Sequence, residues 1–230
     1  MRAEQVTDVV TEHGEGPVWW PGWGGLRLVD TFAGDVVHVA QDGTVSRWHV
    51  ADVVTSLRPR AAGGVVLATR DGFATADAPG GPVRVVADGV VPAPQRMNDG
   101  GCDPYGSFWC GSYDPTGRGA GALFRLGPDD ELSRELDGVH VSNGIVWTTD
   151  GRTAYYADSG PRRVDRFHFD GRRLVAREPF VTIEDGAATT DGLCLDAEGG
   201  SGSRCGRGTK FAATTPPAGW TPSSSCRSPR

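Results

Sequence analysis

Short runs of apolar residues alternate with glycine-rich and proline-rich turns along the first 200 residues. Examples are VVHVA, VSRWHV, VRVVA, ALFRLG and VDRFHF, which are bounded by turn sequences such as Asp-Gly or Gly-Pro. Runs this short, rich in β-branched and aromatic residues, predict β-strands. The 34 glycines and 16 prolines among 230 residues favour the same all-β class.

A longer unit repeats along the same region. In each copy a polar residue leads a short apolar strand, and a glycine turn and a second apolar or aromatic strand follow. Three clear copies are NDGGCDPYGSFWCGS from Asn98, NGIVWTTDGRTAYYADS from Asn143 and DGLCLDAEG from Asp191. Looser copies start at Glu15 and Ser56. The expected turn glycines are Gly22 and Gly24, Gly64, Gly106, Gly151 and Gly199.

The leading positions 15, 56, 98, 143 and 191 are 41, 42, 45 and 48 residues apart, which is the size of a four-stranded propeller blade. Equivalent residues of successive blades point toward one end of the central channel. Two carboxylates and two amides there make an oxygen-rich cluster suited to a divalent cation. For any one of these residues, a simple turn-forming role remains the competing interpretation.

Four ordered segments also carry a family resemblance. They are GEGPVW (14–19), RMNDGGCDPYGSFWCGS (96–112), SNGIVWTTDGRTAYYADS (142–159) and DGLCLDAEGG (191–200). Together they resemble the family of gluconolactonase, regucalcin (senescence marker protein) and luciferin-regenerating enzyme. The resemblance implies a six-bladed β-propeller with one divalent metal at the channel mouth, whose enzymes hydrolyse sugar lactones and related cyclic esters.

Carried over to this sequence, the resemblance implies that Glu15, Asn143 and Asp191 are the metal ligands. It makes Asp191 the catalytic acid/base, and Arg96 and Asn98 the pair that contacts the substrate. A further substrate-contacting acid of the family should precede GALFRL, where this chain has GRGA, and no residue matches it. The metal can be Ca, Zn, Mn or Mg, and the expected partner is a small lactone.

Several of these residues have competing interpretations. Arg96 can instead form a surface salt bridge. His13 and His140, each close before a leading residue, are either donors to the site or structural histidines. Asp99 either adds charge near the metal or forms a turn. For the whole chain, the alternative to a lactonase is a metal-stabilised propeller that acts as a non-catalytic binding platform.

Composition narrows the remaining possibilities. The formal net charge of −6 argues against a nucleic-acid partner. No apolar run of about 20 residues and no N-terminal apolar segment is present, so neither a membrane partner nor secretion is indicated, and we expect a cytoplasmic protein. Of the five cysteines, Cys102, Cys110 and Cys194 are interpreted as small core residues.

The pattern changes abruptly after Gly200. Residues 201–230 contain no Val, Ile or Leu, and they carry five basic side chains but no acidic one. A disordered tail would explain this composition. The genetic code offers another explanation. If the serines are encoded by TCN and the arginines by CGN, a shifted reading frame allows several sequences. One of them is V-W-V-A-L-W-A-G-D-E-V-R-R-Y-D-P, which is a strand, a turn and a second strand.

We therefore predict a partial propeller over residues 1–200, holding about four blades and the first strand of a fifth, and an aberrant, out-of-frame tail over residues 201–230. The next leading residue would fall at about position 237. We expect the chain as written to lack the remaining blades, to fold poorly because sheet edges are exposed, and to be inactive.

The nucleotide sequence from codon 195 onward tests the reading frame. A missing or added base near codon 200 is the expected result, because one shift restores apolar strands where the repeat requires them. A read that confirms the present frame over codons 195–230 would remove the hypothesis.

Overall fold

The computed structural model describes residues 5–184, 189–195, 201–206 and 211–214, with the last two ranges described by their backbone only. The chain forms two compact units, Met1–Val90 and Val91–Arg230. Within the described ranges, the regular structure is β-strand apart from one short 3-10 helix, η1 (Pro21–Trp23). No helix in this described part is long and apolar enough to cross a membrane.

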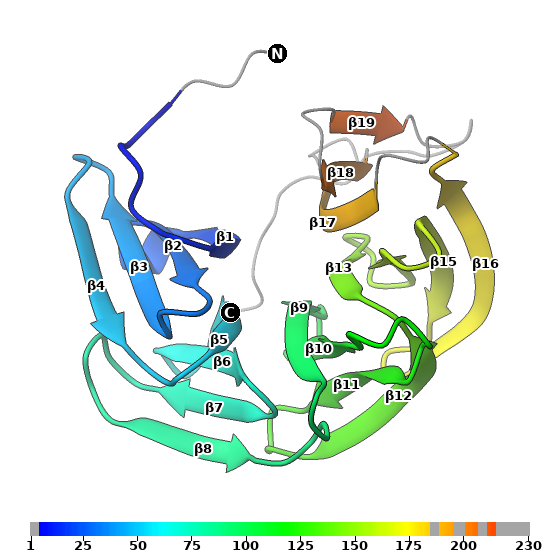
Figure 1. The fold of residues 1–230 in the computed structure, drawn as a ribbon, viewed down its shortest axis with the longest axis horizontal. Coiled ribbons are helices and arrows are strands. Elements are labelled where there is room, and N and C mark those ends of the chain that lie inside the picture. The colour runs from blue at the N-terminus through cyan, green and yellow to red at the C-terminus, as the bar shows by residue number, and fades with distance from the viewer. Residues whose placement is uncertain (1–4, 185–188, 196–200, 207–210, 215–230) are drawn as a thin grey trace. The chain divides into compact units, whose positions relative to one another are not determined.

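The first unit contains two antiparallel sheets, each made of four consecutive strands in chain order (Figure 1). The strands of the first sheet are β1 (Gly14–Trp20), β2 (Gly25–Asp30), β3 (Asp35–Ala40) and β4 (Val45–His49). Those of the second are β5 (Val54–Pro59), β6 (Val65–Thr69), β7 (Phe73–Ala76) and β8 (Val83–Ala87).

The second unit contains two further sheets of the same form and a three-stranded one. The four-stranded sheets comprise β9 (Arg96–Cys102), β10 (Phe108–Tyr113), β11 (Gly121–Leu126) and β12 (Leu132–Val139), then β13 (Ser142–Trp147), β14 (Thr153–Asp158), β15 (Arg163–Phe169) and β16 (Leu174–Thr182). The last sheet comprises β17 (Thr189–Leu195), β18 (Ser201–Gly206) and β19 (Phe211–Thr214). The predicted all-β class and its four four-stranded units are thus confirmed.

The strands β18 and β19 fall in the tail that the sequence analysis interprets as out of frame. Their backbones pair antiparallel with β17 and with each other. Backbone ladder bonds use the N–H and C=O groups that nearly every residue has, so this pairing does not depend on which side chains the tail encodes. The out-of-frame origin of residues 201–230 therefore stays a prediction.

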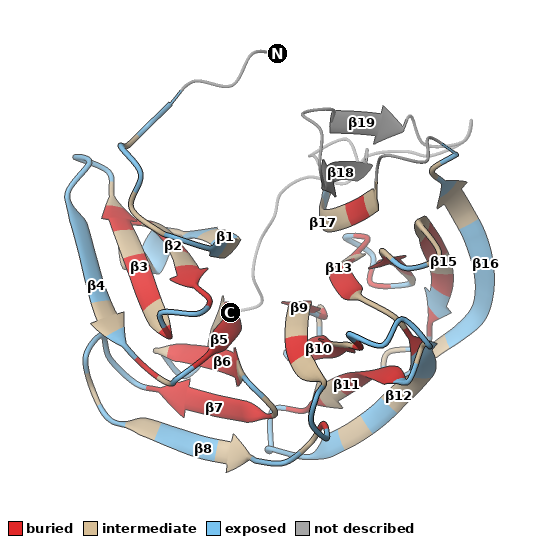
Figure 2. Cartoon of the chain, viewed as in Figure 1, coloured by how far each residue is buried: buried red, intermediate tan, exposed pale blue. Residues whose placement is uncertain are grey.

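In each four-stranded sheet, the second and third strands are at least half buried, whereas the fourth strands β4, β8, β12 and β16 are mostly exposed or intermediate (Figure 2). In the second unit, Trp109 (β10), Trp147 (β13) and Phe169 (β15) pack ring against ring, with centroids 5.6–5.9 Å apart. Trp109 and Trp147 are therefore packing residues of the core of the second unit, where the β9–β12 sheet meets the β13–β16 sheet.

The cysteine prediction is partly wrong. Cys110 in β10 is fully buried, as expected, but Cys102 and Cys194 are exposed. Cys102 is the last residue of β9, and Cys194 lies near the end of β17. Successive strand residues face opposite sides of a sheet, so an apolar residue type alone does not establish which face it occupies.

Most of the predicted turn glycines adopt the left-handed backbone that such turns require. The φ angles are 65° at Gly24, 73° at Gly64, 92° at Gly106 and 69° at Gly151. Gly199 lies outside the described residues. These angles explain the regular glycine spacing, because side-chain-bearing residues rarely adopt them.

First strands of adjacent sheets in the second unit approach closely at two other glycines. A methyl group on Gly101 of β9 would overlap the backbone oxygen of Ile145 in β13. Similarly, a methyl group on Gly144 of β13 would overlap the backbone nitrogen of Leu193 in β17. The absence of a side chain at these positions therefore lets β9, β13 and β17 lie side by side.

The loop from Asp114 to Ala120 closes around a single carboxylate. Asp114 accepts hydrogen bonds from the backbone N–H groups of Ala120 (3.0 Å), Thr116 (2.9 Å) and Arg118 (3.2 Å), and from the Thr116 hydroxyl. The Ala120 N–H, followed by the Thr116 hydroxyl, lowers the pKa of Asp114 to about 2, because these bonds favour the charged form.

We expect Gly144→Ala to destabilise the protein by about 1–3 kcal/mol, because the added methyl group forces the β13 and β17 backbones apart. In a chain of this size, Tm falls by roughly 2–4 °C per kcal/mol. Gly192→Ala is the matched control, since the nearest atom to its new Cβ is Asp99 Oδ2 at 3.9 Å. Equal Tm values for the two variants would contradict the close approach.

We expect Asp114→Asn to lower Tm relative to the wild type near neutral pH. A depressed pKa contributes stability that is present above the unfolded pKa of 3.8 and is lost as the pH falls through the folded pKa of about 2. The Tm difference between the wild type and Asp114→Asn should therefore become smaller as the pH falls from 3.8 to about 2. Scanning calorimetry checks this, with Asp129→Asn on an exposed turn as control. A difference that stays constant down to about pH 2 would show that the carboxylate does not hold the loop.

Candidate functional site

Each of the five first strands contains one register shift against the second strand of its sheet. In β13 and β17, the shift lies between Ser142 and Ile145 and between Thr190 and Leu193. In β9 it lies opposite Cys110–Ser112 of the partner strand, and β1 and β5 have the same irregularity. An extra residue at such a bulge turns a side chain away from the regular pleat.

The predicted leading residues coincide with these shifts. Asn98, Asn143 and Asp191 are each the first residue inside the shift, directly after the last paired residue. Glu15 is the last paired residue before the shift in β1, and Ser56 is the first after the shift in β5. The repeat read from the sequence therefore corresponds to a repeated backbone feature, with Asn98, Asn143 and Asp191 at the same position of their strands.

Buried aspartates hold the entrances to two of these strands. In the first unit, Asp30 at the end of β2 accepts the N–H groups of Glu12 and His13, just before β1. In the second, Asp158 at the end of β14 accepts those of His140 and Val141, just before β13. Burial raises the pKa of Asp30, but the N–H groups of His13 and Glu12 and the side chain of Arg47 outweigh it and lower the pKa overall.

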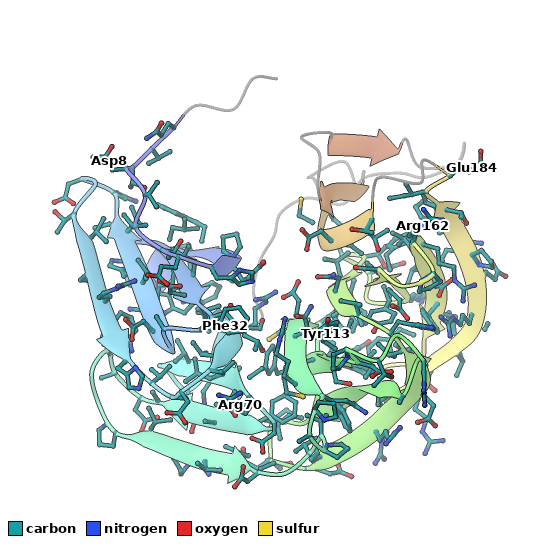
Figure 3. All side chains as sticks on the ribbon, viewed as in Figure 1. Asp8, Phe32, Arg70, Tyr113, Arg162 and Glu184 are labelled. Carbon is teal, nitrogen blue, oxygen red and sulfur yellow. The ribbon has the colours of Figure 1, made fainter. Side chains whose placement is uncertain are left out.

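Arg96 and Asn98 form a connected pair in β9. Arg96 Nη1 donates to Asn98 Oδ1 (2.6 Å) and to the Met97 carbonyl oxygen (2.9 Å). Its guanidinium lies 5.0 Å from the ring centre of Tyr113, which Figure 3 labels at the end of β10. Asn98 Nδ2 donates to the Ser142 carbonyl oxygen (2.6 Å). Both ends of the Asn98 amide are thus held, so its orientation is fixed before any ligand binds.

Asn143 is only 8% exposed, and its side chain is held by a residue that follows β14. Its Nδ2 donates to Ser159 Oγ (2.5 Å), and that hydroxyl donates to the Thr190 carbonyl oxygen (2.5 Å). Because the amide nitrogen is engaged, Oδ1 is the atom of Asn143 left to serve as a ligand. Sequence reasoning missed Ser159. The available signal was its place directly after Asp158, which matches that of Thr31 after Asp30.

Asp191 lies in β17 and is half-buried. Asp99, inside the β9 shift, accepts the Gly100 N–H with Oδ1 (2.7 Å), while its Oδ2 lies 3.9 Å from the Cβ position of Gly192. Asp99 therefore makes a turn contact and also places a carboxylate beside the residue that follows Asp191. Both interpretations of Asp99 from the sequence are compatible with this geometry.

In the first unit, His13 Nε2 lies 3.6 Å from Glu15 Oε1, and both side chains are about half exposed. The His13 ring also contacts Phe32, with centroids 4.9 Å apart. This arrangement favours a role for His13 beside Glu15. His140 packs against the backbone at Gly119 and Gly160, and its Nδ1 lies 3.7 Å from Asp158 Oδ2, an arrangement that favours a structural role.

The predicted metal ligands lie in both units, with Glu15 in the first and Asn143 and Asp191 in the second. Among the described residues, no group of three or more His, Cys, Asp or Glu side chains is placed to hold a metal. The predicted set contains only two such residues and depends on the Asn143 oxygen as its third member. The donor chemistry fits, since all three are oxygen ligands and Asn143 Oδ1 is the end that Ser159 leaves available.

Comparison with known proteins identifies relatives over most of the chain. A family model described as "SMP-30/Gluconolactonase/LRE-like region" matches residues 13–217. Regucalcin of Danio rerio is 31% identical over 225 residues, covering 95% of this chain and 76% of its own length. Pentonolactonase of Haloferax volcanii is 33% identical over 208 residues, covering 86% of this chain and 68% of its own length.

Solved structures confirm the propeller-type fold. A luciferin-regenerating enzyme superimposes with a TM-score of 0.80 at 26% identity, over 87% of this chain and 71% of its own. A calcium-binding regucalcin from Agrobacterium tumefaciens shares the fold, with a TM-score of 0.78 at 22% identity over 86% and 69% of the two chains. The chain therefore belongs to the SMP-30/gluconolactonase/LRE-like family, which includes lactonases and regucalcin.

Proposed function

We propose that the family-level function of this protein is divalent-cation-dependent hydrolysis of a sugar lactone or a related cyclic ester. The chain as written is expected to be inactive, so "wild type" below denotes the chain with its reading frame restored after Gly200. The observation that carries the proposal is the equivalent placement of Asn98, Asn143 and Asp191 at the register shifts of three adjacent strands. Membership of a family that includes a pentonolactonase supports the reaction class.

Glu15, Asn143 and Asp191 would hold the cation through oxygen atoms. A divalent cation bound there would polarise the ester carbonyl and lower the pKa of water. The Agrobacterium tumefaciens regucalcin is described as calcium-binding, which makes Ca²⁺ the first cation to test. A catalytic cation held by three protein ligands would keep positions open for water and substrate.

Asp191 would act as the general base and then the general acid. Its carboxylate accepts a proton from the attacking water as the new C–O bond forms at the carbonyl carbon. It then returns the proton to the ring oxygen as the ring C–O bond breaks, giving the hydroxy acid. Asp191 is half-buried, and Asp99 Oδ2 lies 3.9 Å from the Cβ position of Gly192, the residue that follows it.

Arg96 and Asn98 would orient the substrate. The guanidinium is anchored on Asn98 Oδ1 and the Met97 carbonyl, and it rests beside the Tyr113 ring. This anchoring limits its rotation, so hydrogen bonds to lactone oxygens would cost less side-chain entropy. Asn98 uses its oxygen and one amide proton within the protein, so its second amide proton is the group that would face a substrate hydroxyl.

Asp191→Ala should lower the rate of metal-dependent lactone opening by roughly 10²–10⁴-fold, which is the usual contribution of general acid–base catalysis. A pH-stat assay follows acid release from gluconolactone and pentonolactones with Ca²⁺, Mn²⁺, Zn²⁺ or Mg²⁺ after chelation. Asp191→Asn removes the carboxylate while preserving side-chain volume. Asp129→Ala, on an exposed turn, is the matched control.

Circular dichroism establishes whether each variant keeps the fold. Lactone turnover that is unchanged in folded Asp191→Ala would overturn the assignment. Metal uptake by the wild type without turnover of any lactone would support the binding-platform alternative.

A further inference from the structure

Two hydrogen-bonded links connect the first strands of the second unit in the same direction. The Asn98 amide of β9 donates directly to the Ser142 carbonyl oxygen, one residue before Asn143. The Asn143 amide of β13 reaches the Thr190 carbonyl oxygen, one residue before Asp191, through the hydroxyl of Ser159. Each leading amide thus holds the backbone that presents the next leading residue.

The number of protons fixes the direction of the second link. A serine hydroxyl has one proton, and the Thr190 carbonyl can only accept, so that proton goes to Thr190. Ser159 Oγ must then accept from Asn143, and only the NH₂ end of an amide can donate. The amide therefore directs Nδ2 at Ser159 and Oδ1 away from it.

The backbone at Ser159 is itself held in place. Its N–H donates to the Val141 carbonyl oxygen (3.0 Å), and its own carbonyl oxygen accepts the Arg162 N–H (3.2 Å). The preceding Asp158 is 2% exposed and accepts three backbone N–H groups around the β13 entrance. A hydroxyl on so constrained a backbone can fix the orientation of a neighbouring side chain.

The first unit offers an internal comparison. Thr31 occupies the corresponding place after Asp30, and its N–H donates to the His13 carbonyl oxygen (2.9 Å). Its buried hydroxyl has no hydrogen-bond partner among the described residues. The leading residue of that sheet is Glu15, whose carboxylate has two equivalent oxygens and needs no orientation. An amide does need it, because only one of its ends can bind a cation.

We propose that Ser159 is a positioning residue that sets the orientation of the Asn143 amide and ties it to the β17 backbone ahead of Asp191. Its consequence for metal binding rests on the proposed function, whereas its effect on the Asn143 amide does not. Ser159 thereby presents Asn143 Oδ1 as a cation ligand and couples the positions of two predicted ligands on adjacent strands.

Calorimetric titration with Ca²⁺ alone tests the consequence for the metal. Ser159→Ala should raise the Kd for Ca²⁺ by roughly 10–100-fold, as loss of a residue that orients a ligand does. Ser159→Thr should restore binding, since Thr31 shows that threonine fits the corresponding backbone. The control is Thr148→Ala at the other end of β13, which removes hydrogen bonds to Asp150 and Thr153 and should lower Tm without changing Kd.

A double-mutant cycle separates orientation from general structural support. In an Asn143→Asp background the ligand is a carboxylate with equivalent oxygens. Ser159→Ala should then raise Kd much less than in the wild-type background, because no amide remains to be oriented and only the bond from Ser159 to the Thr190 carbonyl oxygen is lost. An equal loss of affinity in both backgrounds would overturn the positioning role.

The NMR signals of the Asn143 side-chain NH₂ group, assigned by their loss in Asn143→Asp, give a readout without metal. They should shift in Ser159→Ala and return toward wild-type values in Ser159→Thr. Unchanged signals in Ser159→Ala would overturn the inference whether or not Ca²⁺ binds. If the wild type binds none of Ca²⁺, Mn²⁺, Zn²⁺ and Mg²⁺ while these signals do shift, the cation-dependent function is contradicted and the positioning role stands.

Discussion

The extra residue in the first strand of each sheet is the constraint on which the candidate site depends. A regular strand would place alternate side chains on the two faces of its sheet, where neighbouring sheets cover them. The register shift interrupts that alternation at the strand entrance, and in β9, β13 and β17 the interruption falls at Asn98, Asn143 and Asp191. The shift thus turns a polar side chain out of the regular alternation, at a position where the sheet otherwise buries apolar side chains.

Around this feature, the second unit satisfies its polar groups by linking one sheet to the next. Asn98 reaches the backbone of β13, and Asn143 reaches that of β17 through Ser159. Such links require the strands to approach closely, and Gly101 and Gly144 allow this because a methyl group at either position would overlap the neighbouring backbone. Packing and site geometry therefore depend on the same residues. The glycines that let the strands approach also bring the Asn98 and Asn143 amides within hydrogen-bond distance of their partners.

The two kinds of leading residue have different structural needs. Carboxylates such as Glu15 present equivalent oxygens in either orientation, whereas an amide must be turned so that its oxygen faces the ligand. Asn98 is turned by Arg96 and the Ser142 carbonyl, and Asn143 by Ser159. Hydrogen bonds are thus needed to turn the oxygen of each asparagine toward a ligand, whereas either oxygen of the glutamate carboxylate can face it.

The sequence by itself determined the all-β class, the repeated four-stranded unit, most of its turn glycines and the family, because strand period, turn chemistry and ordered motifs are local properties. It could not determine that Cys102 and Cys194 are exposed or that Ser159 bridges Asn143 and Thr190. The face a residue occupies depends on register, and a bond between residues 31 positions apart depends on how strands pack. Only the tertiary structure fixes these relations, because they arise from distances between segments that the chain order leaves open.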